Sequence, residues 1–189
     1  MSTLKPLSKG EFVALMAALA ATVAVSIDAM LPALPEIAAS LSPDAPNRAQ
    51  LVVTSFVFGM GLGTLFAGPL SDAFGRKVMI LAGSSLYIAA AIACYFANSL
   101  DFLLIARVVQ GFGAAFPRIV SIALMRDMFK GREMAKVMSF VMMVFALVPA
   151  VAPLMGQAVI SVLSWQAIFL VYIGFAAITM IWLWLRQPE

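Results

Sequence analysis

The chain has 189 residues, of which 63% are hydrophobic and only 11% are charged, and its formal net charge is +3. Soluble domains carry about 25% charged residues, so this composition indicates an integral membrane protein. Histidine is absent and Cys94 is the single cysteine, which excludes histidine-based catalysis, histidine metal sites and a disulfide within the chain. We therefore expect no enzyme, no metal and no cofactor. The cations lie in loops between apolar runs, which argues against a nucleic-acid partner.

Long apolar runs divide the chain into six expected membrane-spanning helices, each close to the length that a bilayer requires. The expected spans cover 12–34, 49–70, 78–97, 102–125, 137–160 and 167–185. The polar segment 1–11 is then a cytoplasmic leader, 12–185 is one transmembrane bundle, and 186–189 starts a cytoplasmic loop. These runs predict an all-α membrane protein without a soluble domain.

The first span carries one carboxylate, Asp28, near its expected outer end. A charge at a helix centre costs about 2.5–3.5 kcal/mol on insertion scales. A charged residue inside a span therefore indicates a function or a partner. The second span carries Gly59 and Gly63, whose spacing lets a neighbouring helix approach closely.

A short polar break at 68–77 separates the second span from the third. It combines glycines, a carboxylate and two adjacent cations, namely Gly68, Asp72, Gly75, Arg76 and Lys77. Gly75 suits a tight turn with positive φ, and the two cations indicate that the turn lies in the cytoplasm. An ordinary positive-inside turn would explain the cations but not Asp72 together with the two glycines.

The fourth span contains Arg107 and Arg118, about three helical turns apart and so on one face, with Gln110 close to that face. Arg107 lies at the same expected depth as Asp28, so the two are natural partners if their helices face a common cavity. Arg118 is a further possible cavity residue. The alternative is that Asp28 and Arg118 snorkel to the membrane surfaces and have no other role.

The fifth span holds Pro149 and Pro153 on one face, with Gly156 close by. Prolines remove helical hydrogen bonds and bend the helix, while a glycine admits a close neighbour. This spacing predicts a bend in the fifth helix. The charged loop before it, 126–136, contributes Asp127, which is placed to join Asp72 and Arg76.

The distribution of cations predicts the orientation. With the leader in the cytoplasm, the cytoplasmic side holds Lys5, Lys9, Arg76, Lys77, Arg126, Lys130, Arg132, Lys136 and Arg186. The outer side holds only Arg48. By the positive-inside rule, both ends of the chain are expected in the cytoplasm.

Several of these motifs resemble those of the major facilitator superfamily. The break at 68–77 resembles that family's loop signature between two transmembrane helices, and 103–115 looks like the helix-four motif of its proton-coupled members. The stretch 149–156 resembles the helix-five motif of its antiporters, although the usual glycine–proline pair is missing. The stretch 28–35 resembles the first helix of the bacterial Bcr/CflA-like drug:proton antiporters.

The resemblance implies two inverted three-helix repeats, which form one half of the usual twelve-helix fold. The chain is then either the amino-terminal half of a longer transporter or a six-helix protein that pairs with another copy or a partner. The implied activity is proton-coupled efflux of small drugs or metabolites across the bacterial inner membrane by alternating access. The expected partners are a small-molecule substrate, protons, membrane lipid and a second six-helix half.

The resemblance also implies roles for individual residues. Asp28 would exchange a proton for substrate, Arg107 would control its protonation, and Gln110 would be a hydrogen-bonding neighbour. A cytoplasmic latch would consist of Gly68, Asp72, Gly75, Arg76 and Lys77, and Asp127 would join it from the next cytoplasmic loop.

Three other functions are alternatives to efflux. An uptake carrier for a sugar, osmolyte or amino acid would use the same fold, but the helix-five prolines speak against it. An intramembrane hydrolase would need a histidine or paired intramembrane aspartates, and the sequence has neither. A non-transporting membrane assembly protein would not explain the motif at 68–77.

Overall fold

The structure is a computed structural model that describes residues 8–186. Its α-helices are α1 (Lys9–Asp28), α2 (Leu34–Leu41), α3 (Leu51–Phe74), α4 (Arg76–Tyr95), α5 (Leu100–Met128), α6 (Gly131–Val162) and α7 (Ala167–Arg186). Two short 3₁₀ helices, Leu31–Ala33 and Pro46–Gln50, precede α2 and α3. Six helical stretches are long and apolar enough to cross a membrane, and residues 8–186 contain no strand. The expected six spans and the all-α class are confirmed.

The polar connections are shorter than expected because the helices extend beyond the apolar runs. The expected break at 68–77 is wrong in extent, since α3 continues through Pro69 to Phe74 and α4 begins at Arg76. Gly75 alone makes the turn, with the predicted positive φ of 93°. The charged loop at 126–136 is likewise mostly helix, because α5 runs to Met128 and α6 begins at Gly131. Polar residues beyond the hydrocarbon can continue a helix, so hydropathy alone underestimates helix length.

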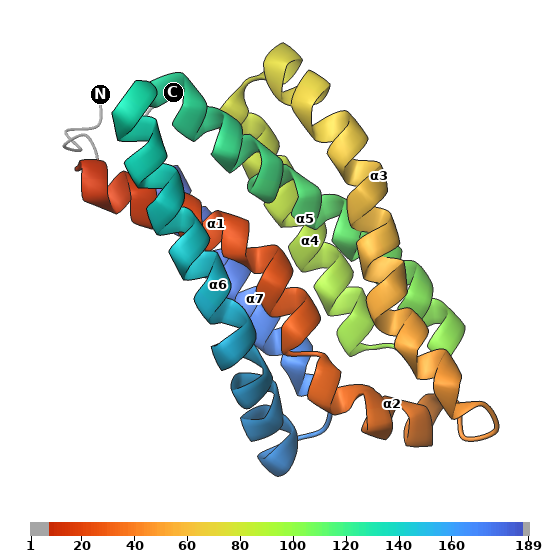
Figure 1. Cartoon of the computed structure of the whole chain (residues 1–189). Helices are drawn as coiled ribbons and strands as arrows, with labels where there is room; N and C mark the ends of the chain where they lie inside the picture. The colour runs from red at the N-terminus through yellow and green to blue at the C-terminus, as the bar shows by residue number, and fades with distance from the viewer. Residues whose placement is uncertain (1–7, 187–189) are drawn as a thin grey trace.

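Both ends of the bundle also differ from the sequence prediction. Of the expected leader 1–11, residues 1–7 lie outside the described residues, and Ser8 caps α1 by accepting a hydrogen bond from Glu11 N. Of the expected loop start 186–189, Arg186 is the last residue of α7, and 187–189 lie outside the described residues. Glu11 and Arg186 form an ion pair, so α1 begins and α7 ends at the same end of the bundle, opposite α2 (Figure 1).

The first span is not the single continuous helix expected over 12–34. It stops at Asp28, turns at Ala29 and Met30, and resumes as a 3₁₀ helix and then α2. Pro32 and Pro35 lack N–H groups and disfavour helical geometry in the residues before them, which accounts for the interruption. The break leaves carbonyl groups at the end of α1 without helical donors.

The packing pattern has the internal symmetry of two three-helix repeats. The repeats are α1, α3 and α4, followed by α5, α6 and α7. In this repeat, α1 corresponds to α5, α3 to α6 and α4 to α7. The contact of α3 with α5 therefore corresponds to that of α6 with α1, and the contact of α4 with α5 corresponds to that of α7 with α1. The contacts of α1 with α5 and of α4 with α7 map onto themselves. Because each repeat has an odd number of spans, the second repeat is inverted in the membrane.

Glycines set the closest helix contacts. A Cβ atom at Gly59 would collide with the Val108 carbonyl of α5, and one at Gly111 would collide with the Phe56 carbonyl of α3. At Gly63 the added Cβ would press against Phe112 and Ala115. The predicted close approach at Gly59 and Gly63 is therefore confirmed. Small residues allow helices to pack backbone to backbone in a bilayer, where van der Waals contact replaces the hydrophobic effect.

We expect Gly59→Ala to destabilise the bundle, because the new methyl group would push α5 away from α3. Overpacking of this kind costs about 1–3 kcal/mol. The matched control is Gly61→Ala, two residues along the same helix, where an added Cβ has no atom within 4 Å. The measurement is the thermal midpoint of helix loss by circular dichroism in detergent micelles. Equal midpoints for the two variants would contradict the close contact.

Candidate functional site

A fully buried arginine lies where α1, α3 and α5 meet. Arg107 has 0% exposed surface, and its Nε donates to the Val52 carbonyl at 3.1 Å while Nη2 donates to the Ser26 carbonyl at 3.1 Å. Its Nη1 donates to Gln110 Oε1 at 2.9 Å, and its Cζ lies 4.3 Å from the centre of the Phe56 ring. No carboxylate pairs with this guanidinium among residues 8–186. Carbonyl oxygens and a ring face therefore compensate the buried charge.

The interruption of α1 makes the Ser26 carbonyl available. In a continuous helix Met30 N would donate to it, but Met30 N donates to the Ile27 carbonyl instead, at 3.2 Å. The freed oxygen accepts from Arg107 and also from the Tyr172 hydroxyl of α7, at 3.1 Å. The proline-induced break of α1 thus creates the acceptor that holds Arg107.

Hydroxyl groups complete this buried polar cluster. The Ser26 hydroxyl lies 2.6 Å from the Tyr87 hydroxyl of α4 and donates to the Thr22 carbonyl at 2.7 Å. Cys94 Sγ lies 3.9 Å from Gln110 Oε1, while Gln110 Nε2 is buried without a partner among the described residues. We call Ser26, Tyr87, Arg107, Gln110 and Tyr172 the polar cluster. It connects α1, α4, α5 and α7 within the apolar interior.

Asp28 lies beside this cluster but does not pair with Arg107. It is the half-buried last residue of α1, two positions after Ser26, and it forms no ion pair or hydrogen bond within residues 8–186. Arg107 reaches the last turn of α1 at Ser26, two residues before Asp28, and the expected equal depth of the two residues in the membrane stays a prediction. The expected ion pair is wrong in this conformation. The guanidinium of Arg107 donates to backbone carbonyls instead, and which carbonyls are available as acceptors cannot be read from a sequence.

The other predicted residue of the fourth span is separate from the polar cluster. Arg118 is half-buried, and its Nη1 lies 3.5 Å from the sulfur of Met60 on α3. Arg118 therefore faces α3 without an acid, and its assignment to a cavity stays a prediction. Within residues 8–186, no cluster of three or more histidine, cysteine, aspartate or glutamate side chains is placed to hold a metal.

The residues of the predicted latch do come together. Arg76 Nη2 lies 2.8 Å from Asp72 Oδ1, and Arg76 Nε lies 3.2 Å from Asp127 Oδ2 at the end of α5. Arg76 Nη1 also donates to the Ser71 hydroxyl at 2.6 Å, and that hydroxyl donates to the Gly68 carbonyl at 2.8 Å. One guanidinium therefore ties the ends of α3, α4 and α5 together. Lys77, the remaining cation of the motif, is half-buried in the first turn of α4.

The helix-five motif lies in α6, which contains both Pro149 and Pro153 without a break. Gly156 is buried, and a Cβ atom there would collide with the Ala29 carbonyl in the turn after α1. The prediction that this glycine admits a close neighbour is confirmed. The predicted bend stays a prediction. Pro149 is exposed and Pro153 is half-buried, so only Gly156 of the three is fully enclosed.

Sequence reasoning did not assign Ser26, Tyr87 or Tyr172 to the site. A signal was present, because all three tyrosines of the chain lie within predicted spans, and Tyr87 lies near the middle of one. A buried tyrosine hydroxyl requires a hydrogen-bond partner. The backbone acceptors offered no comparable signal.

Comparisons with known proteins agree on one family. Residues 13–189 match the family model described as Major Facilitator Superfamily. The chain is 41% identical over 145 residues to a bicyclomycin resistance protein homolog of Haemophilus influenzae, an alignment that covers 77% of the chain and 36% of that protein. It is 36% identical over 145 residues to the multidrug resistance protein MdtL of Shigella flexneri, covering 76% of the chain and 36% of that protein.

A third relative is an uncharacterized MFS-type transporter, YdgK, of Bacillus subtilis. It is 37% identical over 167 residues, which cover 86% of the chain and 41% of that protein. The chain thus spans only 36–41% of the length of these curated relatives. Among solved structures, the Escherichia coli xylose transporter XylE in a partially occluded inward-open conformation matches with a TM-score of 0.83 at 13% identity. That match covers 94% of this chain and 49% of XylE, and at this identity it shows the fold alone.

We expect Arg107→Lys to destabilise the bundle strongly. An ammonium group is a compact charge and cannot reproduce the planar fork that reaches two helices and Gln110. Hydrogen bonds to charged groups contribute about 1.5–3 kcal/mol each, so losing one of them is measurable. The matched control is Arg118→Lys, where the half-buried guanidinium faces a methionine sulfur. Thermal midpoints in detergent compare the variants, and similar losses in both would show that the Arg107 contacts do not hold the helices.

Proposed function

The chain belongs to the major facilitator superfamily, and from this premise we propose that it forms the amino-terminal six-helix bundle of a proton-coupled drug efflux transporter. The observation that carries the proposal is the likeness to proteins named for bicyclomycin and multidrug resistance, at 36–41% identity. These relatives favour efflux of small drugs over sugar uptake. The xylose transporters match at only 13–15% identity and support the fold rather than a substrate.

Transport by this fold needs a second bundle. In alternating access, two bundles rock against each other around a site between them. The least buried spans of the described chain are α6 and α3, which occupy equivalent positions in the two repeats. Both carry exposed apolar side chains, such as Phe58 and Leu65 on α3 and Leu147 and Leu154 on α6. The second bundle would pack against these two helices, whether it belongs to the same chain or to a second copy.

Asp28 is the proposed proton carrier of this bundle. It is the acidic residue that lies inside the apolar spans predicted from the sequence, and it is half-buried without a partner among the described residues. Burial favours the protonated carboxyl, while a nearby cation favours the charged form. Arg107 donates to the carbonyl of Ser26, two residues before Asp28 on α1. A rearrangement that transfers Arg107 from Ser26 to Asp28 would release the proton, and the reverse step would allow Asp28 to bind one.

The Arg76 cluster is the proposed latch at the cytoplasmic end. Its two carboxylates come from different helices, Asp72 from α3 and Asp127 from α5. Exposed ion pairs are weak, typically about 0–1 kcal/mol, so the network can break and reform as the bundles rock. We assign it to the stabilisation of one transport state rather than to the stability of the fold.

We propose that the membrane is the bacterial inner membrane, with the start of α1 and the end of α7 in the cytoplasm. Nine cations on that side against one on the other support this orientation. Single-cysteine labelling in intact cells tests it, since the native Cys94 is buried. An impermeant maleimide should label Asp44→Cys from outside, and Lys130→Cys only after the cells are opened. Labelling of both from outside would overturn the orientation.

We expect Asp28→Asn in the complete transporter, with both bundles present, to abolish proton-driven drug export. An amide cannot carry a proton, while its similar shape keeps the packing at the end of α1. The measurement is drug-induced proton release in inverted membrane vesicles, recorded with a pH-sensitive dye. Asp44→Asn is the control, because Asp44 is exposed in the loop before α3. Full export by Asp28→Asn would place the proton carrier elsewhere, and an unmodified protein without drug-induced proton release would contradict the proposed function itself.

A further inference from the structure

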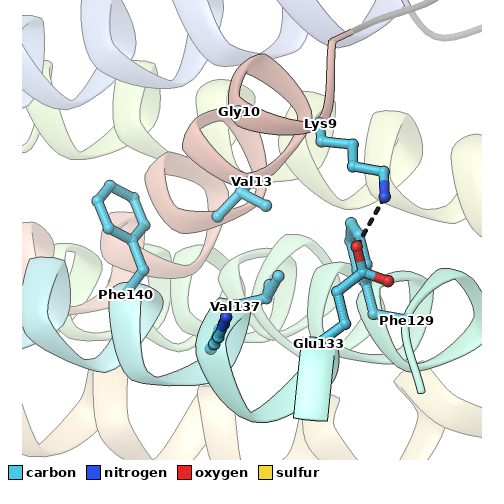
Figure 2. Close-up of a pocket in the computed structure, with 8 residues that line it drawn as sticks. Lys9, Gly10, Val13, Phe129, Glu133, Val137 and Phe140 are labelled. Atoms are coloured by element: carbon cyan, nitrogen blue, oxygen red, sulfur yellow. Dashed lines mark hydrogen bonds and ion pairs between the residues drawn. The ribbon is translucent and has the colours of Figure 1, made fainter. Parts of the chain in front are cut away.

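An apolar groove with a charged rim lies between the first turns of α1 and α6. It has a volume of about 300 Å³, and Gly10 and Val13 of α1 line it together with Val137 and Phe140 of α6. Figure 2 shows Val13 between the two helices, with Phe140 on one side and the ion pair of Lys9 and Glu133 on the other. This groove is distant from the polar cluster, and the proposed transport mechanism gives it no task.

The rim of the groove carries a net positive charge. Lys9 Nζ lies 2.7 Å from Glu133 Oε1, so these two charges neutralise each other. Lys136, one helical turn after Glu133, is exposed and forms no ion pair or hydrogen bond within residues 8–186. The nearest other carboxylate on α1, Glu11, is already bound through both oxygens to Arg186. Lys136 is therefore the uncompensated cation of the rim.

The position of the groove along its helices matches the membrane boundary. Both α1 and α6 are candidate spans, and both begin here, at Lys9 and Gly131. The apolar walls thus lie at the depth of acyl chains, and the lysines lie at the depth of phosphate groups. The positive ends of two helix dipoles add to the attraction for an anion. Basic pockets between transmembrane helices on the cytoplasmic side bind the headgroups of anionic lipids.

We propose that this groove binds one anionic phospholipid of the cytoplasmic leaflet, with its phosphate at Lys136 and an acyl chain along Val13, Val137 and Phe140. The cytoplasmic location rests on the proposed orientation of the transporter. A protein segment fits the groove less well, because it would bury Lys136 in an interface core, where charged residues are depleted. A lipid phosphate instead neutralises Lys136 and leaves its ammonium group hydrated.

The test is native mass spectrometry of the purified chain from mixed micelles of anionic phosphatidylglycerol and zwitterionic phosphatidylcholine at equal mole fractions. The unmodified chain should retain one phosphatidylglycerol in preference to phosphatidylcholine. Lys136→Gln should weaken this retention about fivefold, which corresponds to about 1 kcal/mol for one cation near an anionic group. The matched control is Lys130→Gln, which removes the same charge one residue before α6 without lining the groove.

A second variant tests the groove by volume rather than by charge. Gly10 lines the groove, and a Cβ atom there has no atom within 4 Å, so Gly10→Phe introduces a ring at the groove without a clash at its Cβ. We expect this variant to lose the bound lipid while its thermal midpoint in detergent stays unchanged. Loss of lipid in Gly10→Phe and Lys136→Gln, but not in Lys130→Gln, would support the site.

Several outcomes would overturn the proposal. Equal retention of the two lipids would remove the charge recognition, and an equal effect of Lys130→Gln would reduce it to general surface attraction. Retention by Gly10→Phe would place the lipid elsewhere. A dimer that disappears in Gly10→Phe would make a second copy the occupant. Lipid retention is measured without transport, so its failure leaves the efflux proposal intact, and a failure of efflux leaves the lipid result readable.

Discussion

A guanidinium that is removed from water must find acceptors for its N–H groups, and at Arg107 this requirement links three helices. The acceptors are the Ser26 carbonyl of α1, the Val52 carbonyl of α3 and the Gln110 side chain one turn along α5. The Val52 carbonyl comes within reach because glycines let α3 and α5 touch along their backbones, at Gly59 and Gly111. The buried charge and the close helix contact therefore depend on each other. Replacing the cluster with apolar side chains would remove this demand, so its presence favours a functional role over a purely stabilising one.

The symmetry of the two repeats extends to the way their outer helices approach the centre. Gly59 and Gly63 bring α3 against α5, and Gly156 brings the equivalent helix α6 against the turn after α1. The similarity ends there, because α6 meets α1 where its helix has broken, while α3 meets a continuous α5. The break gives α1 the free Ser26 carbonyl, which accepts from the arginine of α5. The polar cluster is therefore asymmetric although the two repeats pack symmetrically. Of the equivalent helices α1 and α5, only α5 carries a buried arginine.

The sequence predicted whatever depends on local residue chemistry. The spans follow from hydropathy, the positive φ of Gly75 follows from its place in a turn, and the Asp72–Arg76 ion pair follows from their spacing of four residues across that turn. The partners of Arg107 could not be predicted, because two of them are backbone carbonyls. A helical carbonyl can accept from a side chain in two cases. Its helical donor is lost where the helix breaks, as at Ser26, or its second lone pair accepts a further hydrogen bond, as at Val52. The lengths of the turns were overestimated from the polar gaps, because polar residues such as Ser71 and Asp72 continue the helix beyond the apolar run.

The turn after α1 is the place where the proposed binding of a proton at Asp28 would influence the rest of the bundle. Within four consecutive residues, Ser26 binds α5 and α7, Asp28 carries the titratable group, and Ala29 contacts α6 at Gly156. A change of charge at Asp28 alters the field at Arg107, and any shift of this turn moves the backbone against which α6 packs. Coupling between proton and helix position therefore needs no long path through the protein, since one short segment makes both contacts. Because close-packed contacts such as Ala29 with Gly156 leave no room for gradual adjustment, the turn favours discrete arrangements, which alternating access requires.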